Sequence, residues 1–152
     1  MTRWRPVASI KVKVLGVATR GDEFLVSNVQ RDDGRITGVR PLGGSVEFGE
    51  TRVSALHREL MEELGTAIMI TSPWSVLDNI FEHQGVTGHE LISVARIQLM
   101  NSDYYEQDTF SFREHDGTAC QARWMTLEAI HAEGIALYPD GLEAVLGDKL
   151  LI

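Results

Sequence analysis

Residues 43–66 decide the fold, and they read GGSVEFGETRVSALHRELMEELGT. Thr51 carries a hydroxyl that can cap the start of a helix, and Gly65 can end one. Between these two residues, apolar side chains recur every three or four positions, at Val53, Leu56, Leu60 and Leu64. This spacing predicts an amphipathic helix over residues 51–65, with its apolar stripe packed against a sheet.

The same helix carries three carboxylates on one side. At about 100° per residue, Glu59, Glu62 and Glu63 fall within one sector of roughly 100°, beside the leucine stripe. Two carboxylates about 5 Å apart repel each other by roughly 3 kcal/mol at an effective dielectric constant of about 20. A divalent cation would offset this repulsion, and Mg²⁺ takes oxygen ligands of this kind. A solvated acidic surface is the alternative interpretation of the helix taken alone.

The wider pattern around the helix favours the metal site. Gly44 is followed after five residues by Glu50, and after seven more by the run Arg58-Glu59-Leu60-Met61-Glu62-Glu63-Leu64-Gly65. This arrangement resembles the Nudix box, the signature of the Nudix hydrolase family, over Gly44 to Thr66. Thr66 departs from the family pattern, which usually has an apolar residue there, and Leu42 separates Pro41 from the glycines. Neither departure removes a charged residue, so both bear on loop packing more than on chemistry.

The resemblance implies a magnesium site and gives its ligands roles. Glu62 and Glu63 would bind Mg²⁺ directly, with Mn²⁺ as an alternative ion, and the backbone carbonyl of Gly43 would be a further ligand. Glu59 would be another ligand or the base that takes a proton from the attacking water. The sequence leaves both roles of Glu59 open.

Family members often recruit one more acidic residue from a later loop, as a metal ligand or general base. Glu114 is the first candidate for this catalytic role, and Asp116 and Glu90 are alternatives. An ordinary surface carboxylate is an equally good interpretation of each. Glu47 could extend the metal site, although glutamates are common in exposed loops.

Arginines near the box supply positive charge. Arg58 flanks the acidic sector and is expected to pair with Glu50 or another box carboxylate, holding the loop against the helix. Its contribution to catalysis would then be mainly structural. Arg40 is a candidate for binding the substrate's phosphates, although solubility alone would also explain it. Gly44 is a candidate substrate contact, because glycine lets the backbone approach a ligand closely.

The rest of the chain predicts a mixed sheet with helices packed against it. Strands are expected over residues 10–18, 24–29, 76–81, 91–99 and 122–125, short helices over 126–131 and 139–146, and an exposed loop over 30–40. Pro139 is expected in a first helical turn, where proline is tolerated. The predicted class is α/β (α+β), and the resemblance implies a Nudix-like α/β/α sandwich with a mixed β-sheet between helices. No repeat or linker is visible, so residues 1–152 are predicted to form a single Nudix hydrolase domain.

Composition restricts the partners. The net charge of −8 argues against nucleic-acid polymers and anionic membranes, because both bind through Lys and Arg. No apolar run approaches the roughly 20 residues of a membrane-spanning helix, and the N-terminus does not read as a signal peptide. A single cysteine, Cys120, suits a reducing compartment. A cytoplasmic location is therefore expected, and a homodimer is consistent with the common state of related proteins.

These inferences predict Mg²⁺-dependent hydrolysis of a phosphoanhydride bond in a nucleoside diphosphate linked to another group. A nucleoside triphosphate, an oxidised nucleotide or a nucleotide sugar would fit. In related enzymes a proline or tyrosine downstream of the box accompanies ADP-ribose or dinucleoside polyphosphate preference, and neither signal occurs here. A non-catalytic Nudix-fold nucleotide sensor is the main alternative, and an interaction domain with an acidic surface is another.

Overall fold

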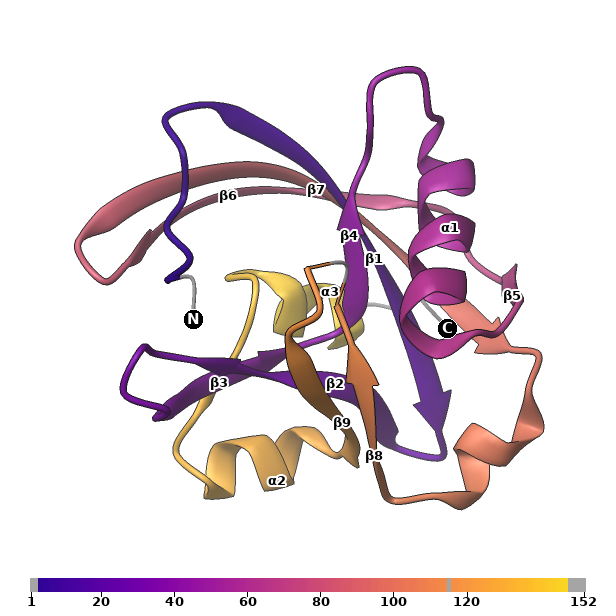
Figure 1. Cartoon of the computed structure of the whole chain (residues 1–152). Helices are drawn as coiled ribbons and strands as arrows, with labels where there is room; N and C mark the ends of the chain where they lie inside the picture. The colour runs from indigo at the N-terminus through magenta and orange to yellow at the C-terminus, as the bar shows by residue number, and fades with distance from the viewer. Residues whose placement is uncertain (1–2, 115, 148–152) are drawn as a thin grey trace.

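The computed structural model describes residues 3–114 and 116–147 (Figure 1). The elements run in the order β1 (Ile10–Arg20), β2 (Glu23–Gln30), β3 (Ile36–Arg40), β4 (Leu42–Ser45), α1 (Arg52–Leu64), β5 (Ile68–Ile70), β6 (Ser75–His83), β7 (Val86–Leu99), a 3₁₀ helix η1 (Ser102–Glu106), β8 (Thr109–Arg113), β9 (Ala119–Met125), α2 (Leu127–Ala132), β10 (Ala136–Leu137) and α3 (Leu142–Gly147). The predicted mixture of helices and a mixed sheet is confirmed.

Strand β1 joins two parts of the sheet. Its first part pairs in parallel with β7, from Ile10 opposite His89 to Ala18 opposite Ile97, and antiparallel with β4. Its last two residues pair with β2 instead. β6 and β5 extend the sheet on β7, whereas β3 and β9 flank β2. Figure 1 shows β6 and β7 as a long curved ribbon arching away from the strands around β2.

Helix α1 forms where the sequence predicts it. The Thr51 hydroxyl accepts a hydrogen bond from the backbone N–H of Ser54, and Gly65 ends the helix in the left-handed conformation with φ of 66°. Leu56 and Leu60 are fully buried in a cluster that also holds Val14 and Trp124. Val53 was expected in the stripe, but the residue is 46% exposed, whereas Ala55 is fully buried.

The opposite face of β1 is covered by the C-terminal helices. Because side chains alternate along a strand, Leu15 and Val17 point away from α1 and belong to a second buried cluster. That cluster includes Ile130 of α2 and Leu142 of α3. Helices therefore lie on both faces of the sheet. This layering holds α1 against one face, with its Glu59 beside β4.

Several boundaries differ from the predictions. The expected exposed loop over residues 30–40 contains strand β3, whose Val39 is fully buried. Glycines and charges dominate this segment and mask its short alternating pattern. Pro139 precedes α3 and lies outside it, since the helix begins at Leu142. Strands β4, β5, β8 and β10 were not predicted, because runs of two to five residues give too little periodicity. In the described part of the chain, no helix is long and apolar enough to cross a membrane.

Truncating Leu60 should reveal how strongly α1 depends on its buried stripe. The Leu60→Ala variant should lose about 2–5 kcal/mol of unfolding free energy, because a fully buried leucine leaves a cavity that neighbours fill only in part. Urea denaturation followed by circular dichroism measures this loss. Val53→Ala is the matched control, and a loss as large as that of Leu60→Ala would contradict the burial pattern.

Candidate active site

Two glycines bring α1 against the sheet. A Cβ atom on Gly44 would lie 2.3 Å from Cδ of Glu59, and a Cβ on Gly43 would lie 1.9 Å from the carbonyl oxygen of Val14. Neither position has room for a side chain. The glycine pair of β4 therefore lets the Glu59 carboxylate rest directly on the backbone beside it.

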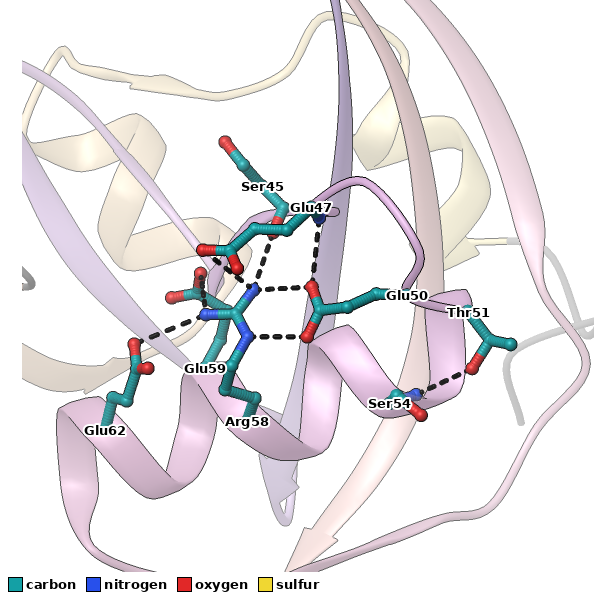
Figure 2. Close-up of polar contacts among 8 residues, drawn as sticks. All are labelled: Ser45, Glu47, Glu50, Thr51, Ser54, Arg58, Glu59 and Glu62. Atoms are coloured by element: carbon teal, nitrogen blue, oxygen red, sulfur yellow. Dashed lines mark hydrogen bonds and ion pairs between the residues drawn. The ribbon is translucent and has the colours of Figure 1, made fainter.

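Arg58 is the centre of the polar network shown in Figure 2. Its Nε and Nη2 donate to the two carboxylate oxygens of Glu50 at 2.6 and 2.8 Å, which is a bidentate pair. Nη1 donates to Glu59 at 3.0 Å and to Glu62 at 3.3 Å, and Nη2 also donates to the carbonyl oxygen of Ser45 at 2.9 Å. The predicted pairing of Arg58 with Glu50 is present, and Arg58 also ties β4 and the loop to α1.

Glu50 is held as an anion by these contacts. The Arg58 hydrogen bonds, followed by the backbone N–H of Glu47, lower the pKa of the Glu50 carboxyl to about 2. The same pairing raises the pKa of Arg58 above its usual range. Glu47 itself lies 3.9 Å from Arg58 with 64% of its side chain exposed. Its main contact with the network is therefore through its backbone.

Glu63 is a partly buried carboxylate on the same side of α1 as Glu59. Burial raises its pKa to about 9, and the adjacent negative charge of Glu59 acts in the same direction. Glu114 adds further negative charge, whereas Arg40 opposes the rise. Charges from three parts of the chain therefore act on the Glu63 carboxyl. Glu59 lies on α1 with it, Glu114 follows β8, and Arg40 ends β3.

The donor set suits a hard divalent cation. Carboxylate oxygens and a backbone carbonyl are the ligands that Mg²⁺ prefers, and a buried carboxylate beside a second one is compensated by a cation. Among the described residues, no three acidic, histidine or cysteine side chains converge on one point, and Arg58 engages Glu59 and Glu62 here. Residues of the box fit the ion by the chemistry of their oxygen donors.

The alternative acidic candidates, Asp116 and Glu90, make polar contacts with other residues. Asp116 accepts a hydrogen bond from the backbone N–H of Thr118 within its own turn. Glu90 is buried on β7, where it contacts Asn79 and lies 4.0 Å from Lys13. These contacts give Glu90 a role separate from the carboxylate patch of α1. Sequence reasoning missed Lys13 and Asn79, and the only signal was a lysine alternating with apolar residues in a strand.

The comparisons with known proteins agree with this geometry. The family model for the NUDIX domain matches residues 10–142. The chain therefore belongs to the Nudix family, and the predicted Nudix fold is confirmed.

Individual relatives are more distant. Nucleoside triphosphatase NudI of Enterobacter sp. (strain 638) is 42% identical over 60 residues, which cover 38% of this chain and 43% of that protein. The aligned part is thus less than half of the relative. A NUDIX hydrolase from Nitrosomonas europaea superposes with a TM-score of 0.63 at 18% identity, covering 91% of this chain and 87% of that one. The E. coli ORF135 protein gives 0.55 at 23% identity, covering 91% and 90%. At these identities the two structures show a shared fold.

Proposed function

We propose that the protein is a Mg²⁺-dependent pyrophosphohydrolase that cleaves a phosphoanhydride bond of a nucleoside triphosphate. The observation that carries this proposal is the Glu59 carboxylate packed against Gly44 of β4, with the partly buried Glu63 on the same side of α1. The 42% identical segment of a relative described as a nucleoside triphosphatase supports the choice of a triphosphate. A nucleotide sugar or an oxidised nucleotide would use the same site.

The box residues would hold the metal. Glu62, Glu63 and the carbonyl of Gly43 are the proposed ligands, with Glu59 as a further ligand or as the base. When bound there, Mg²⁺, or Mn²⁺ in its place, would neutralise charge on the phosphates and lower the pKa of the attacking water. Arg40 binds a phosphate oxygen beside Glu63, consistent with the electrostatic influence that it has on that carboxyl.

The remaining chemistry belongs to protein side chains. Glu59 or Glu114 takes a proton from the water, whose oxygen forms the new bond to phosphorus. The P–O bond opposite the attacking water breaks, and its electron pair leaves with the departing product. A triphosphate then yields a nucleoside monophosphate and pyrophosphate. Arg58 acts as a positioning residue, because it fixes the carboxylates of Glu59 and Glu62 relative to the loop.

A sensor that binds a nucleotide without cutting it is the alternative function. Non-catalytic modules of this family tend to lose box carboxylates, whereas Glu50, Glu59, Glu62 and Glu63 are all present. The complete set favours catalysis. A cytoplasmic location, a single domain over residues 1–152 and a homodimer stay predictions.

A substrate panel tests the proposal. The protein should be incubated with nucleoside triphosphates, nucleotide sugars or ADP-ribose, in millimolar Mg²⁺ or in EDTA. The released nucleotide and pyrophosphate are then measured. Turnover of triphosphates should be lost in EDTA and in Glu62→Gln, and restored in the wild type by added Mg²⁺. The exposed Glu128→Gln variant is the control for the charge change. Binding of nucleotides without any turnover would support the sensor instead.

A further inference from the structure

A row of buried polar side chains crosses three neighbouring strands on the face of β1 away from α1. Asn79 on β6 lies directly opposite Glu90 on β7, and their side chains are joined by a 3.3 Å hydrogen bond from Nδ2 to Oε1. Lys13 on β1 extends the row, with its Nζ 4.0 Å from Oε2 of Glu90. Asn79 is only 8% exposed and Glu90 only 7%. We call Lys13, Glu90 and Asn79 the polar row.

The apolar surroundings of the polar row make its burial energetically unfavourable. Its neighbours on the same face include Leu15 and Ile92, both in the apolar cluster. Burying charges costs several kcal/mol per ion, and well-packed apolar residues in their place are often at least as stabilising. Burial also lowers the pKa of Lys13, and its charge is opposed by nearby Arg40. Stability alone therefore gives no reason for these three residue types.

Glu90 retains capacity to accept hydrogen bonds. A carboxylate offers about four acceptor sites. The hydrogen bond from Asn79 is long at 3.3 Å, and Nζ of Lys13 lies beyond hydrogen-bond distance at 4.0 Å. About 10% of the Glu90 side chain and 19% of the Lys13 side chain remain exposed, so both side chains keep some contact with solvent. The polar row thus offers the two carboxylate oxygens of Glu90 as hydrogen-bond acceptors, with the Lys13 ammonium group beside them as a donor.

The polar row lies within reach of the phosphate site. Strand β4 pairs with β1 beside Lys13, which is opposite Ser45, and the glycine pair of β4 carries the Glu59 contact. Arg40, just before β4, acts electrostatically on both Lys13 and Glu63. Strand β4 thus separates the proposed phosphate site from the polar row, and a nucleotide would have to cross β4 to place its base over the polar row.

From this geometry we propose that Glu90, flanked by Lys13, determines base specificity and that the base is guanine. This inference rests on the proposed function. Guanine presents two adjacent donors, N1–H and the 2-amino group, which match the two oxygens of one carboxylate, and its O6 accepts from Lys13. Adenine and cytosine present an amino donor beside a ring-nitrogen acceptor, which a carboxylate repels. Uracil and thymine present one N–H between two carbonyl oxygens.

Comparing GTP with ITP tests the proposal, because inosine differs from guanosine only by the missing 2-amino group. The wild type should show kcat/KM for GTP roughly tenfold or more above that for ITP, carried mainly by KM. Glu90→Gln should bring the two substrates to within about twofold while keeping its fold by circular dichroism. The control Glu82→Gln, an exposed residue of the same hairpin, should keep the preference.

The outcomes separate this inference from the proposed function. Turnover of triphosphates with equal GTP and ITP rates, or a preference that survives in Glu90→Gln, would overturn the guanine assignment and leave the hydrolase intact. Calorimetric binding of GMP and IMP gives the same comparison without turnover. GMP bound more tightly than IMP only when Glu90 is present would support the assignment even if no triphosphate is cleaved, and equal binding would overturn it.

Discussion

Glu63→Gln should lower kcat/KM for triphosphate hydrolysis by about 10²–10³-fold without destabilising the metal-free protein. The loss follows because the amide can no longer balance the cation's charge at this partly buried position of the box. Folding should not suffer, because burial and the charge of Glu59 already disfavour the Glu63 carboxylate anion. Steady-state kinetics with Mg²⁺ and thermal unfolding in EDTA measure the two effects.

The pH dependence of the melting temperature tests the predicted effect of Glu63 on stability. The Glu63 pKa is raised from 4.5 to about 9 in the folded protein, so folding favours the protonated carboxyl. Its stabilising effect is complete below about pH 4.5 and is lost as the pH rises toward 9. In EDTA, the melting temperature of the wild type should therefore fall relative to Glu63→Gln between pH 5 and 9. A constant difference, or full activity of the variant, would contradict the assignment, and Glu106→Gln serves as the exposed control.

Arg58→Lys should lower activity by about 10- to 100-fold and weaken Mg²⁺ binding, although it keeps the positive charge. Lysine cannot reproduce the planar fork that holds both oxygens of Glu50 while reaching Glu59, Glu62 and the carbonyl of Ser45. The carboxylates would then lose their fixed orientation. Kinetics against Mg²⁺ concentration separates weaker metal binding from slower turnover.

Arg123→Lys is the matched control for this variant. Arg123 also makes a bidentate pair, with Glu133, but this pair lies outside the box. Its substitution should leave kcat/KM within about twofold. Similar losses in both variants would show that a general loss of stability explains the effect, and would remove the positioning role of Arg58.

The parts of the fold and site that could be predicted are those encoded locally. Thr51 and Gly65 bound α1 because capping involves neighbouring residues, and the spacing of Glu59 and Glu63 places them on one side of the helix. The partner of Arg58 could also be anticipated, since Glu50 precedes it within the same motif. Each of these features depends on fewer than about ten consecutive residues.

The parts that could not be predicted depend on strand pairing between distant segments. Glu90 was considered as an extra acid for the metal site, and only the register between β6 and β7 shows that it faces Asn79. Lys13 joins them because β1 pairs with β7 in parallel, an arrangement that hydrophobic periodicity does not encode. Arg40 was proposed for phosphate binding from its charge alone, and its place near Glu63 follows from the unpredicted strand β3.

The parallel pairing of β1 with β7 also bears on how the protein folds during synthesis. Ile10 pairs with His89, a separation of 89 − 10 = 79 residues, and α1 lies inside the chain loop that this pairing closes. A helix of 13 residues is marginal alone in water. Strands β1 and β4, on which α1 packs, precede it in the chain, but the apolar cluster around its leucines is completed by residues of β7, β8 and β9. The leucine stripe of α1 is therefore fully covered only after these later strands have left the ribosome, and such long-range closure is a slow step. Until then the nascent chain leaves part of this stripe exposed to chaperones.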